Sequence, residues 1–358
     1  MNLLASTRSS RRRPFKALIV TGIALAIGAK PAIAIDISGV GATFPYPIYA
    51  KWADAYKKET GVSVNYQSIG SGGGMRQIIA KTVVFGASDM PLRAEQLKKD
   101  RLVQFPTVVG GVVPIINVGG IKTNDIIFDG PTLSAIFMGK ISSWDDSRIK
   151  KLNAIVKLPS LPIAVVHRSE GSGTTFLFTD YLSKVSDEWK SKVGANTSVE
   201  WPTGIGAKGN EGVANNVMRT KGSIGYVEYA YAKQNRLPIA KLVNKDGKIV
   251  VANADSFKAA AANANWDATF GFGVVPTNEP GANSWPLVGA TFILMQMQPR
   301  DVNAAREAIK FFAWTYAKGG SMAEELDYVP MPDKVVSSIK RAWSEITDMN
   351  GKPIFPVP

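Results

Sequence analysis

The run Arg168 to Thr175 (RSEGSGTT) carries the side chains best suited to binding an oxyanion. It lies between an apolar stretch expected to be a strand (163–166) and one expected to be a helix (176–182). Glycines let backbone N–H groups approach a ligand closely, and a helix N-terminus adds unpaired donors and a favourable dipole. The hydroxyls of Ser172 and Thr174 add donors, and the arginine adds a planar, permanently charged fork. A Ser-capped helix after a glycine turn is the alternative interpretation.

Two further glycine-bearing segments have the same character. Residues 70–74 (GSGGG), which include Ser71, form an expected tight loop between a strand and a helix. Residues 39–45 (GVGATFP) place Thr43 and Phe44 just before another expected helix, where the proline suits a helix start. Each segment is a weak motif by itself. Together with the first run, they predict an anion site to which several helix N-termini contribute donors.

Asp89 stands at the end of an apolar run (82–88) that we expect to be a strand. A carboxylate beside an anion site repels the anion unless that anion carries a proton. Phosphate keeps at least one proton near neutral pH and can donate it to Asp89, whereas sulfate has none to give. Two buried acceptors that face each other unpaired are strongly unfavourable. We therefore interpret Asp89 as a specificity element rather than a catalyst; a helix N-cap is the alternative.

The segments that contain these residues resemble the periplasmic phosphate-binding proteins of bacterial ABC-type phosphate importers. The resemblance extends from residue 35 to near residue 349. Its matching segments, in chain order, are GATFPYPIYAKW (41–52), NYQSIGSGGG (65–74), FGASDMPL (85–92), RSEGSGTTF (168–176) and GSIGYVEYAYAKQN (222–235). Several long segments in the right order argue strongly against a chance match.

The resemblance implies high-affinity binding of inorganic phosphate without chemistry, and it assigns the ligand contacts. In this chain they fall on Thr43, Phe44, Ser71, Asp89, Arg168, Ser172, Gly173 and Thr174. The resemblance also implies that Asp89 accepts the phosphate proton. The family usually has Asp two residues after the arginine, where it orients the guanidinium. This chain has Glu170 there, which is one methylene longer.

The same resemblance implies an α/β fold of the periplasmic binding protein class (type II-like), with two lobes, two hinge crossings and a ligand cleft between the lobes. Two apolar runs without surface periodicity, 108–118 and 287–297, are expected to be strands buried on both faces, and we interpret them as the crossings. The predicted organisation is a signal peptide, a first lobe made of two separate segments, and a second lobe inserted between them: 1–34, then 35–113 with 286–358, and 114–285.

Helical periodicity predicts the main helices of the first lobe. Apolar residues recur at helical spacing over residues 47–60, and Gly61 can end that helix. The segments 301–319 and 334–349 also have helical patterns. We expect this closing helical section to pack on the first lobe, so that the first lobe contains both ends of the mature chain.

The first 34 residues have the three-part layout of a secretory signal peptide. Basic residues precede an apolar run (17–29), which is followed by the small-x-small sequence Ala32-Ile33-Ala34. The pair Arg12-Arg13 leaves both the general secretory and the twin-arginine export routes open. A lipid anchor needs a cysteine at the mature N-terminus, and the chain has none. We therefore expect a freely diffusing periplasmic protein whose signal peptide is removed.

The charge pattern favours a small anion over a nucleic acid as the ligand. The signal peptide holds six of the 42 basic residues and no acidic residue, so the other 36 basic and 29 acidic residues give a net charge of +7. These charges are scattered along the sequence, whereas a nucleic-acid-binding face would show a cluster of basic residues. The expected partners are phosphate and the permease and ATPase subunits of an importer, because the chain has no G-x-x-x-x-G-K-[ST] loop. We expect a monomer without a cofactor.

Other ligands and enzyme classes form the alternatives. Arsenate and sulfate are other tetrahedral oxyanions, and a secreted phosphatase-like enzyme is the alternative that performs chemistry. A serine hydrolase would pair Ser172 with His167, the only histidine, but Glu170 occupies the first glycine position of G-x-S-x-G. One histidine and no cysteine exclude a metal cluster built from those residues, and no metal site is expected.

Two weaker patterns point to other ligands. Residues 204–209 (GIGAKG) fit the dinucleotide pattern G-x-G-x-x-G, but the preceding Trp201-Pro202 interrupts the strand that this motif needs. The tryptophans raise the possibility of sugar stacking. Trp144, Trp201 and Trp285 stand in turn-like contexts where we expect partial exposure, yet no grouping of tryptophans indicates a binding platform.

Overall fold

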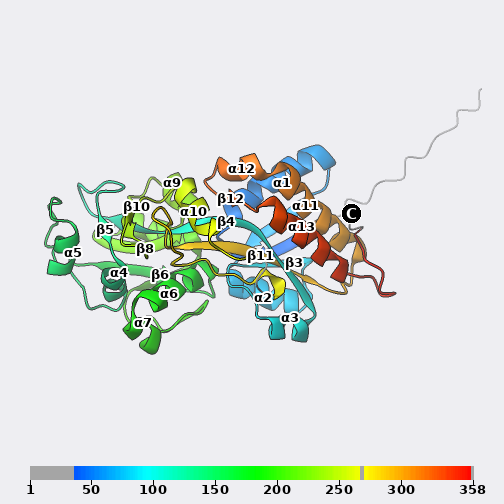
Figure 1. The fold of residues 1–358 in the computed structure, drawn as a ribbon, viewed down its shortest axis with the longest axis horizontal. Helices are drawn as coiled ribbons and strands as arrows, with labels where there is room; N and C mark the ends of the chain where they lie inside the picture. Colours follow the sequence, from blue (N-terminus) through cyan, green and yellow to red (C-terminus); the bar gives the residue numbers. More distant parts are fainter. Residues whose placement is uncertain (1–35, 267–269, 356–358) are drawn as a thin grey trace, which may run out of the picture. The chain divides into compact units, whose positions relative to one another are not determined.

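The computed structural model describes residues 36–266 and 270–355 of the chain (Figure 1). The signal peptide predicted over residues 1–34 lies outside these described residues. Within them, no helix combines the length and the apolar character that are needed to cross a membrane.

One long strand, β4 (Leu102–Asn117), joins two sections of the main sheet. Its first part pairs antiparallel with β11 (Val288–Gln296), and its last part, from Val112 on, pairs antiparallel with β8 (Ser223–Glu228). Every residue of β11 and all but the last residue of β4 are buried. The prediction that residues 108–118 and 287–297 form buried strands is therefore confirmed.

The described strands of the main sheet combine parallel and antiparallel pairing. They follow the order β2 (Val64–Ser68), β1 (Ile37–Gly41), β3 (Phe85–Ser88), β11, β4, β8, β6 (Ala164–Arg168) and β7 (Ile205–Ala207), with β12 (Val329–Pro330) paired to β4. A small separate sheet contains β10 (Ile249–Val250), β9 (Lys241–Val243) and β5 (Ile127–Phe128). Because β1 is parallel to β2 and β3, these three strands end at one edge. β6 and β7 likewise end together.

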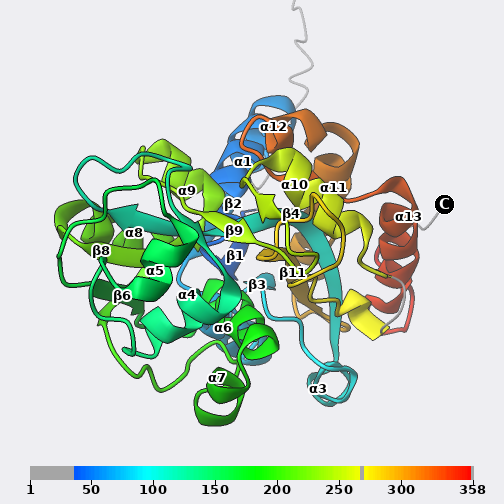
Figure 2. The same cartoon turned by 60° about the vertical axis from the view of Figure 1, so that its left-hand side comes forward.

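Helices from the beginning and from the end of the described chain cover the first section of the sheet. They are α1 (Tyr46–Thr60), α2 (Ser71–Ile79), α3 (Ala94–Asp100), α11 (Val302–Lys318), α12 (Gly320–Glu324) and α13 (Asp333–Ala342). Helix α11 contacts both β1 and α1, and α13 contacts β4. The orange helices α11 and α12 accordingly lie beside the blue helix α1 in both views (Figure 1, Figure 2).

The second section of the sheet has its own helices. They are α4 (Gly130–Phe137), α5 (Ser147–Leu152), α6 (Gly173–Val185), α7 (Asp187–Lys192), α8 (Gly209–Arg219) and α9 (Tyr229–Gln234). Helix α10 (Ala254–Ala262) instead contacts β4, β11 and β12. Helix α8 packs on β8 and β6, and α4 packs on α6. Helix α6 follows directly from β6, so the residues between them lie at the carboxyl end of that strand.

Helix α1 forms almost where its periodicity predicts. Ile48, Tyr49, Trp52 and Tyr56 recur every three to four residues and are buried on one face of the helix. The helix ends at Gly61, whose φ of 77° is left-handed and suits a residue without a side chain. The predicted helix over residues 47–60 is therefore confirmed, with a start one residue earlier.

The predicted loop over residues 70–74 is wrong, because α2 already begins at Ser71. Among residues 70–74, only Gly70 has a positive φ, of 89°. A Cβ atom built on Gly74 would lie 2.6 Å from Ala87 O and 2.7 Å from Gly41 Cα. These glycines therefore let the first turn of the helix pack directly on the backbones of β1 and β3, which a local reading of the sequence does not reveal.

The closing helix predicted over residues 334–349 is also too long. Helix α13 ends at Ala342 and is followed by one turn of 3₁₀-helix. The N–H of Thr347 then donates to Met297 O, just beyond β11, at 2.8 Å. A tertiary hydrogen bond to the sheet thus replaces continuation of the helix.

Trp144 and Trp285 are fully buried, contrary to the predicted partial exposure. The indole N–H of Trp144 donates to Gly222 O at 2.8 Å, and that of Trp285 donates to Val112 O at 2.8 Å. Each indole therefore finds its polar partner on a distant segment of the chain, which allows it to be buried.

We predict that Gly74→Ala lowers the free energy of unfolding by about 2 kcal/mol, because the new methyl group would overlap backbone atoms that cannot move aside. The gain of about 1 kcal/mol in helix propensity does not offset this overlap. Urea unfolding measures the change. The matched control is Gly119→Ala, at an exposed site with no atom within 4 Å of the added Cβ. Equal stability of the two variants would contradict the close packing of α2.

Candidate functional site

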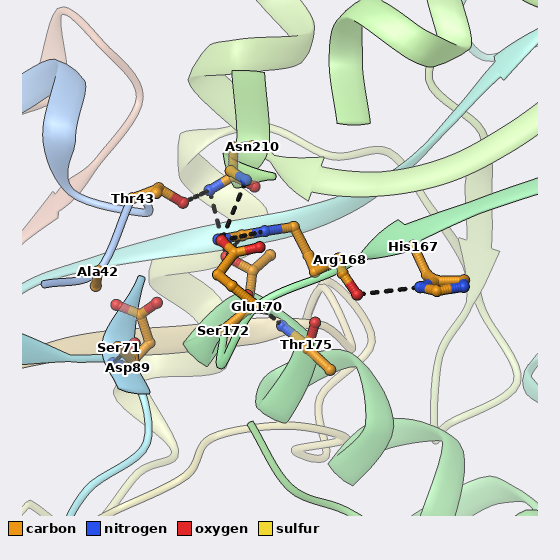
Figure 3. A network of polar contacts seen from close by, with 12 residues as sticks. Ala42, Thr43, Ser71, Asp89, His167, Arg168, Glu170, Ser172, Thr175 and Asn210 are labelled. Atoms are coloured by element: carbon orange, nitrogen blue, oxygen red, sulfur yellow. Dashed lines mark hydrogen bonds and ion pairs between the residues drawn. The ribbon is translucent and has the colours of Figure 1, made fainter. Parts of the chain in front are cut away.

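The structure brings together all eight residues that the sequence singles out as ligand contacts, and Figure 3 labels five of them: Thr43, Ser71, Asp89, Arg168 and Ser172. All are buried, and even Arg168 exposes only 3% of its surface. They come from the loop between β1 and α1, the first turn of α2, the residue after β3, and the stretch from the last residue of β6 to the first turn of α6. In that order they are Thr43 and Phe44; Ser71; Asp89; and Arg168, Ser172, Gly173 and Thr174.

The first turns of α2 and α6 face each other at this site. The N–H of Gly72 donates to Gly171 O at 2.9 Å. A Cβ atom on Gly173 would lie 2.5 Å from Ser71 Oγ and 2.5 Å from Asp89 Cβ, so only a glycine allows this approach. Because the first N–H groups of a helix lack intrahelical acceptors, both helices direct donors and positive dipole ends toward one place.

The guanidinium of Arg168 is held in a fixed orientation. Its Nε donates to Glu170 Oε1 at 3.0 Å, and its Nη2 forms an ion pair with the same oxygen. Its Nη1 donates to Thr174 Oγ1 at 3.3 Å. The backbone N–H of Gly209 also donates to Glu170 Oε1, at 3.1 Å. Glu170 therefore orients the arginine, despite being longer than the aspartate that the resembling family has at this position.

Asp89 combines full burial with one unsatisfied oxygen. Its Oδ1 accepts a hydrogen bond of 2.7 Å from Thr291 Oγ1, whereas its Oδ2 is buried without a partner among the described residues. Burial raises the pKa of Asp89 to about 7, although the Thr291 hydrogen bond and the charge of Arg168 oppose this shift. Asp89 is not a helix N-cap, because the next helix, α3, begins only at Ala94.

Ser172 is a helix cap and a site residue at once. Its Oγ accepts a hydrogen bond from the backbone N–H of Thr175 at 3.1 Å, which is the N-cap arrangement. The hydroxyl hydrogen is not used in that bond, so Ser172 can still donate to an anion. The two interpretations of this segment are therefore compatible.

Asn210 belongs to the same polar cluster and was missed by the sequence analysis. It is fully buried, and its Nδ2 lies 2.7 Å from Thr43 Oγ1 and 3.3 Å from Thr174 Oγ1 (Figure 3). Its Oδ1 accepts from the N–H of Glu228 at 3.0 Å. The sequence does contain a signal that points to Asn210: Gly209-Asn210 follows a short strand, in the same strand–glycine–helix pattern as the other loops.

The G-x-G-x-x-G pattern over residues 204–209 does not form a dinucleotide loop. Strand β7 runs through its middle, and α8 begins at Gly209. A pyrophosphate-binding turn would need these glycines in a loop between a strand and a helix. The segment instead delivers Asn210 to the candidate site.

His167 is not placed to activate a nucleophile. Its ring stacks on Trp201 with centroids 4.7 Å apart, and its Nδ1 lies 3.0 Å from Arg168 O. Figure 3 shows it pointing away from Ser172. Burial lowers the pKa of His167. Over residues 36–266 and 270–355, no three His, Cys, Asp or Glu side chains gather as a metal ion would require.

Comparison with known sequences identifies close relatives. A family model described as "PBP superfamily domain" matches residues 26–318. The chain is 53% identical to the phosphate-binding protein PstS of Pasteurella multocida over 89% of this chain and 93% of the relative. It is 37% identical to the phosphate-binding protein PstS of Methanocaldococcus jannaschii over 86% of this chain and 85% of that relative.

Solved structures share the fold at lower sequence identity. A phosphate-binding protein from Stenotrophomonas maltophilia superposes with a TM-score of 0.64, at 19% identity over 88% of this chain and 96% of that one. A human phosphate-binding apolipoprotein gives a TM-score of 0.68, at 22% identity over 86% and 94% of the two chains. The α/β periplasmic binding protein fold expected from the sequence is therefore confirmed.

We predict that Asp89→Asn changes the pH dependence of stability in buffer without phosphate or sulfate. The pKa of Asp89 is about 7 in the folded protein and about 4 in the unfolded chain, so the folded state retains a proton that the unfolded chain releases. The stability contributed by Asp89 is thus present below about pH 4 and is lost as the pH rises to about 7. The variant should gain about 3 kcal/mol relative to wild type between these limits, measured by urea unfolding. A constant difference would show that Asp89 ionises normally.

Proposed function

Because the chain belongs to the PstS family of phosphate-binding proteins, within the PBP superfamily, we propose that it binds inorganic phosphate with high affinity and delivers it unaltered to an ABC-type importer. One observation carries the proposal. The fixed guanidinium of Arg168 and the unpartnered Oδ2 of Asp89 share one buried site with the facing N-termini of α2 and α6. A ligand that suits this site must be an anion that also has a hydrogen to donate.

Phosphate fits both requirements. Its negative oxygens accept hydrogen bonds from Arg168 and from the hydroxyl groups of Ser71, Ser172 and Thr174. Its remaining proton is shared with Asp89, whose burial raises its pKa to about 7. Sulfate has no such proton, so Asp89 opposes it above about pH 7, where the carboxyl group is ionised. Arsenate has the geometry and the protons of phosphate, and we expect it to compete for the site.

The lobes of the proposed fold are residues 35–113 with 286–358, and residues 114–285. Support for this division comes from β4, which exchanges its partner β11 for β8 at Val112. The second crossing runs beside the first, because the N–H of Val112 donates to Leu287 O at 2.8 Å and Trp285 donates to Val112 O. Two adjacent crossings form a hinge that lets the lobes close over a ligand.

We place the protein in the periplasm as a monomer, without a lipid anchor or cofactor. The signal peptide predicted over residues 1–34 supports export. A structurally similar protein is described as a high affinity periplasmic phosphate-binding protein. The proposed partners are the permease and ATPase subunits of the importer, since the chain has no phosphate-binding loop for a nucleotide.

The direct test is calorimetric titration of the mature chain, stripped of ligand by unfolding and refolding, with phosphate and then sulfate. At a pH above 7, where Asp89 is ionised, we predict one-to-one binding of phosphate and no response to sulfate. In Asp89→Asn we expect measurable sulfate binding, because the amide can donate a hydrogen bond where the carboxylate repels. Equal binding of both anions by the wild type would contradict the role of Asp89. No response to either anion would contradict the proposed function.

Arg168→Ala should weaken phosphate binding by about 2–5 kcal/mol, the range seen when one partner of a buried charged pair is removed. The same titration measures this change. Arg148→Ala serves as the matched control, because Arg148 is exposed and its hydrogen-bond partners, Asp146 and Lys140 O, are not among the site residues. Unchanged affinity in Arg168→Ala would show that phosphate is held elsewhere.

A further inference from the structure

The loop that carries Thr43 is tied to the opposite lobe by two hydrogen bonds. The hydroxyl of Tyr231 donates to Thr43 O at 2.7 Å, and Asn210 Nδ2 donates to Thr43 Oγ1 at 2.7 Å. Thr43 belongs to the segment 35–113, whereas Tyr231 and Asn210 belong to the segment 114–285. Both bonds therefore cross the proposed cleft directly from protein to protein.

Both donors, Tyr231 and Asn210, are positioned by Glu228, the last residue of β8. The backbone N–H of Glu228 donates to Asn210 Oδ1 at 3.0 Å. Its side-chain Oε2 accepts from the N–H of Ala230 at 3.0 Å and so caps α9, the helix that carries Tyr231. Glu228 pairs in the sheet with Val112, where β4 changes its partner strand. Glu228, which positions both donors, thus lies at the proposed hinge.

A second tyrosine fixes the next carbonyl of the same loop from within the first lobe. The hydroxyl of Tyr328 donates to Phe44 O at 2.7 Å. Successive carbonyls, those of Thr43 and Phe44, are thereby held by tyrosines from two lobes. Tyr231 is the one whose bond must break when the lobes separate.

We propose that Tyr231 is a positioning residue that latches the closed form and thereby slows the release of phosphate. This inference rests on the proposed function. The bond from Tyr231 to Thr43 O exists only while the lobes are closed, so it favours the closed form by differential contact. Its loss leaves Thr43 O without that donor at a buried position, which penalises the closed form alone. Phosphate enters the open form, whose energy the bond does not affect.

The test compares Tyr231→Phe with the matched control Tyr229→Phe by stopped-flow tryptophan fluorescence with phosphate. Tyr229 lies on the same helix, and its ring packs on Phe257, but its hydroxyl makes no hydrogen bond to any described residue. We expect Tyr231→Phe to release phosphate about tenfold faster with an unchanged association rate, as the loss of one buried hydrogen bond implies. Tyr229→Phe should behave as wild type. Equal dissociation rates in the two variants would overturn the latch.

A second readout separates failure of the latch from failure of the proposed function. If wild type binds no phosphate, the proposed function fails, and amide hydrogen exchange of the ligand-free proteins then decides on the latch. Tyr231→Phe should increase exchange in residues 42–49, because the loop is released from the second lobe. Tyr229→Phe should not. Unchanged exchange in Tyr231→Phe would in that case overturn the latch.

Discussion

The permanent charge of Arg168 is the constraint on which the site depends. Its side chain is only 1% exposed, so the charge has been removed from water, which is unfavourable unless neighbouring groups compensate for it. Glu170 supplies one compensating charge and fixes the direction of the fork. The positive ends of α2 and α6 add to the local potential instead of reducing it. The guanidinium and the unpaired N–H donors of these helix starts therefore make the site suited to an anion.

Asp89 places a buried carboxyl group in the same site as Arg168. In a site that only attracts anions, a buried carboxylate would weaken binding. The nearby cation by itself would lower the pKa of this carboxyl group. Here desolvation outweighs the attraction of Arg168, so the pKa of Asp89 rises. Thr291 occupies one carboxyl oxygen and leaves the other unpaired among the described residues. This balance is the basis of the proposed sensitivity of the site to the protonation of its ligand.

The sequence revealed those parts of the site that depend on local pattern. Strand–glycine–helix segments identified three of the loops, since the donors of a helix N-terminus come with the chain that forms it. It did not reveal Asn210, whose partner Thr43 lies 167 positions away. The buried indole of Trp285 was missed for the same reason, because its acceptor belongs to β4. Contacts between distant segments leave no periodic signal that single-sequence reasoning can detect.

The position of β11 in the sheet has a consequence for how the protein assembles. This strand lies between β3 and β4, although residues 88 and 117, where these two strands end, precede residue 288, where β11 begins, by 200 and 171 positions. Until β11 is available, β3 and β4 have no shared neighbour, and Asp89 lacks Thr291, which lies 202 positions later. Such long-range pairing makes folding slow. Until β11 pairs, the apolar edges of β3 and β4 can associate with other incompletely folded chains. The ligand site is thus among the last parts to form, and refolding should succeed best in dilute solution, where incomplete chains rarely meet.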